Sequence, residues 1–379
     1  MSRLTENSQK SKVESQKTLL SLSVSGLLTL SVAVFLSAVL LPSCAPRVAT
    51  SFWKIGTPED SILPGYTVIH AEGKTRHCYP VTEWKTTDEK EDVYHSLHHH
   101  GVAVESELMA YRIYFDKKQT IDPYCKRKPQ LELAQSYWYP NDSLLAEGYG
   151  DDILRVSGTV GVGSVKYWNG KLYHIEDVGE RQQRIVKKHR NKATIAVCDV
   201  DWTVPDGNQD DPEKRKVVDL NVEYTMRAGH RDMRCDVFCS GSLNESLPLY
   251  GGAGGGFEGL CTGVQTIPAK GGKDTISIIL PNGVLLASWG TDWPVNDSAK
   301  YAKETVGLGV FIPKEYAGKL VHNKQNNLCL LNTLPFREGH GVGCHFYLTC
   351  CGATKENHPV ASSAEEWFAY LCRWAKSLK

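Results

Sequence analysis

Residues 105–128 read ESELMAYRIYFDKKQTIDPYCKRK, and this stretch guides the interpretation of the whole chain. Segment 109–115 alternates as a strand does, which places its odd-numbered residues on one face and Arg112 and Tyr114 on the other. Asp122 follows in a second short alternating run. An arginine beside a tyrosine on one sheet face can bind a hydroxylated or anionic ligand. The alternative is a solvated face whose long side chains only cover apolar surface.

The composition favours a strand-and-turn protein of ordinary globular character. The 379 residues are 41% hydrophobic and 23% charged, and they include 33 glycines, 17 prolines and 17 tyrosines. Such a makeup is typical of antiparallel sheets rather than helical bundles. We predict a mainly β fold, with residues 66–379 as one β-sandwich domain. The 43 basic and 43 acidic residues cancel, so no long-range field attracts nucleic acid, and nucleic-acid partners are excluded.

The N-terminus carries the features of an export signal. Three lysines in residues 10–17 precede an apolar run over residues 19–41, which ends in LPSCA. This order predicts a lipoprotein signal peptide over residues 1–44 with Cys44 lipidated, and a polar tether over residues 45–65. A single membrane-spanning helix is the alternative. Both place the rest of the chain outside the cytoplasm, in the cell envelope.

Cysteines and histidines do not predict a metal centre. Eleven cysteines remain after Cys44, so at least one is unpaired; an exported protein can form disulfides, but spacing does not give their connectivity. No CxxC pair is present, which disfavours structural zinc. Consecutive histidines on an extended chain point to opposite faces, so of His98, His99 and His100 only the first and third share a side. We predict no metal and no cofactor.

Several segments predict specific elements along the chain. Asn169-Gly170 indicates a β-hairpin, segments 193–202, 217–226 and 233–238 a meander, and segment 276–288 another hairpin. Ser363 followed by Glu366 is typical of a capped helix that presents a tryptophan stripe to the sheet. The glycine-rich run 250–260 matches GxGxxG but lacks the strand, helix and Gly-Lys-Ser/Thr ending of a nucleotide loop. A tight turn is the better interpretation.

A family resemblance rests on residues 105–128, on EGYGDDILRVSGTVGVGSVKYWNGKLYHI at 147–175, and on the closing HFYLTCCGATKENHP with EEWFAYL. Over most of residues 66–375 the chain resembles an uncharacterised family of bacterial lipoproteins often encoded beside polysaccharide-degrading enzymes. The resemblance implies a large antiparallel β-sandwich like that of galactose mutarotases, closed by a C-terminal helix. That fold also serves glycoside hydrolases, lyases and sugar-binding domains, so it implies a carbohydrate ligand more firmly than a reaction.

The first functional hypothesis is an enzyme acting on acidic, uronate-containing glycan fragments. Arg112 would clamp the substrate acid and Tyr114 would assist it. The remaining candidate catalytic groups are Glu105, Asp122, His98, His230 and His340, and the candidate substrate-binding residues are Lys126, Trp138, Tyr139, Trp168 and Glu258. Hydrolysis, elimination and epimerisation all stay open. In this hypothesis Arg112→Ala abolishes activity and leaves the thermal midpoint within a few degrees.

Two alternatives come from other classes of protein. A non-catalytic lipoprotein would capture oligosaccharides on Trp138, Tyr139 and Trp168 as stacking platforms. A structural envelope protein would need only the lipid anchor. Turnover on a panel of acidic glycans separates the enzyme from the binding protein.

Overall fold

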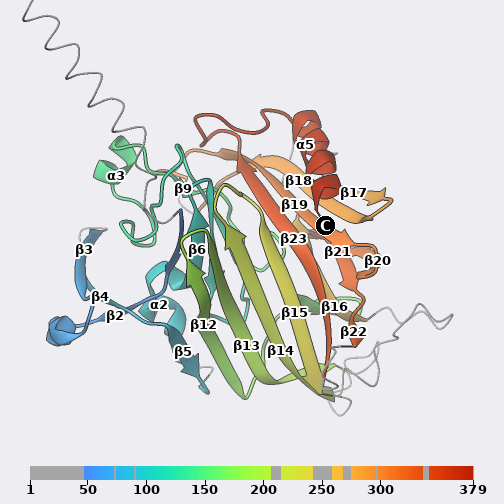
Figure 1. Ribbon diagram of the computed structural model, residues 1–379, viewed down its shortest axis with the longest axis horizontal. Helices are drawn as coiled ribbons and strands as arrows, with labels where there is room; N and C mark the ends of the chain where they lie inside the picture. Colours follow the sequence, from blue (N-terminus) through green and yellow to red (C-terminus); the bar gives the residue numbers. More distant parts are fainter. Residues whose placement is uncertain are drawn as a thin grey trace, which may run out of the picture. The chain divides into compact units, whose positions relative to one another are not determined.

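The computed structural model describes residues 47–71, 74–88, 91–205, 215–241, 258–267, 275–295, 298–335 and 341–378. These residues belong to one compact unit, Pro46–Lys379. Antiparallel sheets dominate it, as the composition predicts (Figure 1). The glycine-rich segment 250–260 lies outside the described residues except for 258–260.

The described residues form four sheets, and in each the named neighbouring strands pair antiparallel. The largest follows the order β17 (Thr275–Leu280), β18 (Gly283–Asp292), β19 (Glu304–Pro313), β23 (Val342–Gly352), β15 (Met233–Gly241), β14 (Arg215–Arg227), β13 (Lys192–Pro205), β12 (Glu180–His189) and β5 (Glu83–Thr86), with β22 (Leu334–Pro335) on β23. A five-stranded sheet faces it, in the order β1 (Val48–Ser51), β6 (Gly101–Ser106), β7 (Met109–Tyr114), β8 (Ile121–Cys125) and β9 (Asp151–Asp152).

Two smaller sheets and a few helices complete the unit. One sheet has the order β11 (Leu172–Tyr173), β10 (Lys166–Trp168), β16 (Gly259–Gln265), β21 (Asn326–Leu331) and β20 (Ala317–His322); the other is β2 (Trp53–Gly56), β4 (Lys74–Pro80) and β3 (Thr67–Ala71). The helices are α2 (Val93–Ser96), α3 (Asp142–Ala146) and α5 (Ala364–Ser377), with 3₁₀ turns η1 (Pro58–Ile62) and η2 (His98–His100).

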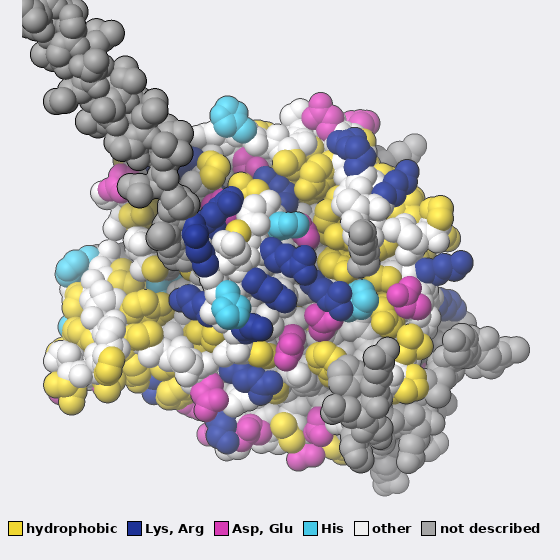
Figure 2. All heavy atoms as spheres, viewed as in Figure 1, with side chains coloured by type: hydrophobic (Ala, Val, Ile, Leu, Met, Phe, Trp, Pro, Cys, Tyr) yellow, Lys and Arg dark blue, Asp and Glu magenta, His cyan; other side chains and the backbone are white. Residues whose placement is uncertain are grey.

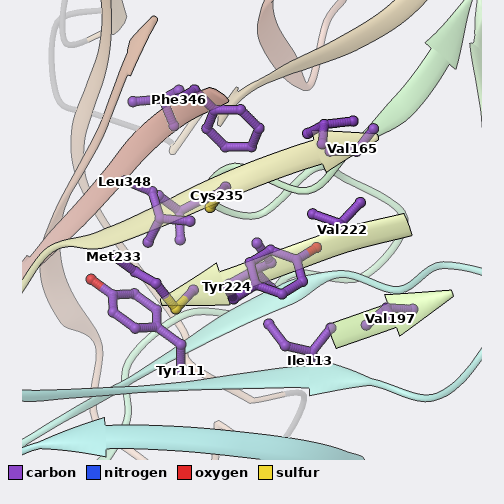
Figure 3. Packing of buried hydrophobic residues seen from close by; sticks show 14 of the residues in the cluster. Tyr111, Ile113, Val165, Val197, Val222, Tyr224, Met233, Cys235, Phe346 and Leu348 are labelled. Carbon is purple, nitrogen blue, oxygen red and sulfur yellow. The ribbon is translucent and has the colours of Figure 1, made fainter. Parts of the chain in front are cut away.

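The core lies between the largest sheet and the β7 sheet. Tyr111 and Ile113 of β7 point at Tyr224, Met233 and neighbouring side chains of β14, β15 and β23 (Figure 3). These side chains are almost completely buried, and each contributes roughly 1.5–3 kcal/mol by leaving water. The odd-numbered face of β7 is therefore the apolar face that the alternation predicts.

The C-terminal helix covers the outer side of β18 and β19, as Figure 1 shows. Ser363 Oγ accepts a hydrogen bond from the Glu366 backbone N–H at 3.3 Å, which is the predicted N-cap. Trp367 packs so closely on Gly307 that a Cβ there would lie 2.6 Å from its ring. A glycine is needed at this position because the indole occupies the space of a side chain.

The predicted hairpins and meander are confirmed. Gly170, with φ +106°, turns the chain between β10 and β11, β13, β14 and β15 pair in sequence, and Gly283 turns the chain from β17 into β18. Residues 79–84 are divided between β4 and β5. Pro80 ends β4, because a proline cannot donate to a sheet ladder.

The predicted tether is wrong for its described part. Residues 47–65 contain β1, β2 and η1, and β1 pairs with β6 from Val48 onward. Prolines and polar residues suggested a linker, but they serve turns between short edge strands. Among the described residues, no helix has the length and apolar character to cross a membrane. The apolar run at 19–41 and Cys44 are not among those residues.

All eleven cysteines after Cys44 are described, and each is a free thiol. Nine of them are buried, where they act as small apolar side chains. Burial raises the pKa of Cys78 to about 11 and that of Cys239 to about 12. These thiols therefore stay protonated at neutral pH and contribute packing.

Candidate active site

The outer face of β7 carries the centre of the candidate site. Arg112 is 1% exposed, and all three nitrogens of its guanidinium donate hydrogen bonds. Nε and Nη2 donate to Asp122 Oδ2, Nη2 also donates to Asp152 Oδ2 at 2.7 Å, and Nη1 donates to the Trp138 carbonyl at 2.7 Å. Asp122 is the register partner of Arg112 on β8. The structure thus brings the two predicted residues into direct contact on one sheet face.

One guanidinium serves two carboxylates, so the buried cluster holds a surplus of acid. Burial, followed by the charge of Asp122, raises the pKa of Asp152 well above its usual range. Burial also raises the pKa of Asp122, and the Arg112 charge only partly opposes this. The pair therefore retains a proton more readily than exposed aspartates do. Asp122 Oδ1 is buried and has no hydrogen-bond partner among the described residues.

Tyr114 connects this buried cluster to a cavity. Its hydroxyl donates to Asp122 Oδ2 at 2.6 Å, and its side chain lines a cavity of about 790 Å³. Tyr94 and Tyr139 line the same cavity. Burial raises the pKa of Tyr94 to about 12 and also raises the pKa values of Tyr114 and Tyr139. All three phenols are therefore neutral proton donors at pH 7.

The cavity wall is cationic where it meets solvent. Lys118, Arg155 and Lys324 line it against a single lining carboxylate, Asp292. Arg155 Nη2 lies 4.0 Å from Asp292 Oδ2, and Lys118 Nζ lies 4.0 Å from Asp116 Oδ2. Both contacts are at the outer limit of an ion pair and are solvated, so they are weak. Hydroxyl and amide groups fill the rest of the polar wall: Ser157, Thr159, Thr266, Gln265 and Gln325.

A family model described as a domain of unknown function (DUF4861) matches residues 63–379. The chain belongs to the DUF4861 family. No curated protein matches the chain. The description of this family names no reaction and no ligand.

The histidine run of this DUF4861 domain forms an internal support for the site. Residues 98–100 are the 3₁₀ turn η2, not an extended chain, and His99 and His100 both have φ of 60°. His100 stacks on Tyr94 at 3.9 Å and on Trp138 at 4.3 Å between ring centroids. His98 and His99 donate to the Ser136 and Leu133 carbonyls. The run therefore holds the aromatic segment over β7.

Protonation of these histidines costs stability, which gives a pH prediction. Burial lowers the pKa of His98 to about 4 and that of His100 to about 3. Because the unfolded chain binds protons first, stability is complete above pH 6.5 and is lost as the pH falls toward these values. At pH 5 each histidine should cost about 2 kcal/mol.

A melting series from pH 8 to pH 5 on the wild type and His100→Gln checks this. The wild type should lose more stability than the variant over that range. Asp122 and Asp152, whose raised pKa values act in the opposite direction, are common to both proteins and cancel in the difference. A constant difference between the two curves would contradict the role of His100.

Glu105 and Lys126, predicted as a catalytic and a binding residue, form a buried ion pair with each other. The Glu105 carboxylate also accepts hydrogen bonds from the Glu132 and Leu133 backbone N–H groups at 2.8 and 3.1 Å. Both side chains are at most 2% exposed. The structure places this pair where it fixes segment 131–133 rather than at the cavity wall.

The other predicted site residues are dispersed. Trp138 stacks on His100 and donates to the Leu97 carbonyl at 3.2 Å, Trp168 is 7% exposed and lines a different cavity, and Glu258 pairs with Lys216 at 3.4 Å. His230 is exposed and contacts Asp232. His340 lies outside the described residues. Of the predicted set, Tyr114 and Tyr139 line the main cavity, with Arg112 and Asp122 behind Tyr114.

Sequence reasoning missed Tyr94, Asp152 and the cationic rim. Asp152 was detectable as one of two consecutive aspartates in a glycine-punctuated strand region, but its distance of 40 residues from Arg112 gave no sign of contact. The rim residues come from separate loops. In the part of the chain that the structure describes, no three His, Cys, Asp or Glu side chains are grouped to hold a metal ion.

Proposed function

We propose that this protein is a carbohydrate-active enzyme of the cell envelope that cleaves uronate-containing oligosaccharides by β-elimination in the Tyr114 cavity. The observation that supports this most is the position of Tyr114, which lines the cavity while its hydroxyl donates to Asp122. Elimination needs a base for the C5 proton of the uronate, an acid for the leaving oxygen and a cation for the carboxylate. All three kinds of group line this cavity or stand directly behind it.

In the proposed reaction, Tyr114 takes the proton from C5 while its own proton passes to Asp122 Oδ2. The C5–H electron pair becomes the C4=C5 double bond, the C4–O4 bond breaks, and the leaving oxygen takes a proton from Tyr94 or Tyr139. A neutral phenol with a raised pKa suits the second step. Lys118 and Arg155 neutralise the uronate carboxylate, which acidifies the C5 proton.

Elimination is favoured over hydrolysis by the placement of the carboxylates. Hydrolysis uses two carboxylates that face each other across the sugar at roughly 5–9.5 Å. Asp292 is the only carboxylate among the described residues lining the cavity, and Asp122 and Asp152 lie behind the wall with exposures of 0% and 3%. The tyrosine route needs only tyrosines and cations at the cavity wall, with Asp122 behind the wall to accept the proton of Tyr114.

The test is a release assay of purified protein on acidic plant and algal glycans. A lyase produces unsaturated uronates, which absorb in the ultraviolet, together with new reducing ends in equal number. Reducing ends without absorbance would replace elimination by hydrolysis. Measurable affinity without turnover would favour the alternative function, a non-catalytic oligosaccharide-binding protein. The burial of Asp122 is compatible with this alternative, because a buried carboxylate does not contact the sugar.

The cationic rim gives a prediction on substrate binding. Lys118→Gln should raise KM for uronate oligosaccharides by about tenfold or more, because a charge-assisted hydrogen bond contributes roughly 1.5–3 kcal/mol. For the wild type, methyl esterification of the substrate should raise KM by a comparable factor. For Lys118→Gln, esterification should cause no further rise in KM. Lys314→Gln, an exposed lysine that does not line this cavity, is the matched control. Equal KM values in all three proteins would refute the carboxylate contact.

The proposal includes lipidation at Cys44, which the LPSC ending of the signal-like segment supports. The resemblance to lipoproteins encoded beside polysaccharide-degrading enzymes supports the same location and a glycan substrate. Mass spectrometry of the membrane-purified protein should find an N-terminal peptide that begins at a diacylglyceryl-modified Cys44. An intact Met1 form in those membranes would refute the lipoprotein assignment and favour a spanning helix.

A further inference from the structure

The turn between β12 and β13 is the most basic segment of the described chain that the site does not use. Residues 187–192 read KKHRNK, with four lysines or arginines, one histidine and no acid. All six residues are exposed. Exposed side chains on a turn between strands do not contribute to packing, and the repulsion between these like charges slightly lowers the stability of the fold. A surface of this charge favours an anionic partner.

Other cations come together at the same end of the sheet. Lys192 pairs across the ladder with Arg227 of β14, and the Arg47 backbone N–H donates to the Arg190 carbonyl at 3.0 Å. We call this surface the basic end; it comprises Lys187, Lys188, Arg190, Lys192 and Arg227, and beside it lies Arg47, whose side chain pairs with Glu107 Oε1. Figure 2 shows lysine and arginine side chains gathered on the face drawn there, over the long strands of the sheet.

The basic end lies where the chain leaves the proposed membrane anchor. Only Ala45 and Pro46 separate Cys44 from Arg47, and the three Cα–Cα steps between them span at most about 11 Å. Electrostatic attraction to a charged surface extends about 8–10 Å at physiological ionic strength. Because β1 begins at Val48, no long linker allows the folded unit to move away. A spanning helix over residues 19–41 would leave only residues 42–46 between the membrane and Arg47.

We propose that the basic end docks on anionic phospholipid headgroups and so fixes the orientation of the domain on the membrane. This inference depends on the anchor under the proposed function but not on the reaction. Along β6, Val48 pairs with Ser106 at one end and Tyr114 pairs with Gly101 at the other. The cavity that Tyr114 lines is therefore about 17 Å along the strand from the docked end.

The test uses the full-length anchored protein in vesicles of phosphatidylcholine alone or mixed with phosphatidylglycerol. Both vesicles retain the anchor, so the readout is amide hydrogen exchange in residues 187–192 and 227–231. We expect at least fivefold slower exchange in these segments on the anionic vesicles, with the difference lost at high salt. Lys192→Glu/Arg227→Glu should abolish the difference while leaving the melting temperature unchanged, because both side chains are exposed.

Lys85→Glu/Arg215→Glu is the matched control, since it changes the net charge equally. Arg215 begins the strand that Arg227 ends, and Lys85 lies beside the first residues of β12 rather than the last. This control should retain the lipid-dependent protection. Equal exchange on both kinds of vesicle, or protection by uronate oligosaccharides instead of vesicles, would overturn the proposal. If the protein is found without any anchor, the lipoprotein assignment is wrong but the docking proposal is still testable. Cosedimentation of the protein with anionic vesicles then tests the basic end.

Discussion

Replacing Arg112 by methionine should lower the free energy of unfolding by about 3–5 kcal/mol, because it leaves two buried carboxylates without their cation. Arg112 is 1% exposed and donates to both Asp122 and Asp152. Urea denaturation followed by circular dichroism measures the loss. The alternation of β7 alone suggested a substrate clamp whose removal leaves folding intact. Burial reverses that expectation for stability.

The matched control is the triple variant Arg112→Met/Asp122→Asn/Asp152→Asn. It removes all three charges together and should recover part of the lost stability, since neutral amides are less costly to bury than ions. Arg215→Met, at an exposed position, should change stability by less than about 0.5 kcal/mol. An Arg112→Met protein as stable as Arg215→Met would show that the carboxylates do not need the guanidinium.

Tyr114→Phe should lower kcat by about 10²–10⁴ on the substrate that the release assay identifies, the range typical of a lost acid–base group. KM should change little, because the ring remains at the cavity wall. The hydroxyl that is removed donates to Asp122 Oδ2 at 2.6 Å, so the free energy of unfolding should also fall by about 1.5–3 kcal/mol. Steady-state kinetics at several pH values measure the first effect and urea denaturation the second.

Tyr173→Phe serves as the control for this substitution, since Tyr173 of β11 does not line the cavity. Tyr139→Phe distinguishes the two proton transfers. It should affect substrates with a poor leaving group most if Tyr139 is the acid, whereas Tyr114→Phe should affect all uronates alike. Retention of wild-type kcat in Tyr114→Phe would eliminate the proposed relay and leave a binding cavity.

The sequence predicted the fold well because its signals are local. The alternation of β7, the Asn169-Gly170 turn and the Ser363 cap each depend on a few adjacent residues, and each appears in the structure. The tether prediction failed for residues 47–65 because short edge strands obtain their stability from partners distant in sequence. Val48 of β1 pairs with Ser106 of β6, and no pattern in either segment indicates that pairing.

The candidate site was predictable only in part. Arg112, Tyr114 and Asp122 follow from strand alternation, since a shared face is a property of the strand itself. What covers that face is decided by segment 131–139 and the turn at His98–His100, which pack on it from elsewhere. Because these segments cover Arg112, its guanidinium supports the buried cluster instead of contacting a ligand. Tyr114 remains at the boundary with solvent.

The alternation of β7 also makes this strand unusually sensitive to a change in length. Insertion or deletion of one residue between Met109 and Arg112 would shift the following side chains to the opposite face. The guanidinium would then enter the apolar interior beside Tyr224, and after a deletion Ile113 would take its place against the two buried aspartates. We therefore expect natural and laboratory variants of this strand to tolerate substitutions at Ala110 far better than the insertion or deletion of one residue.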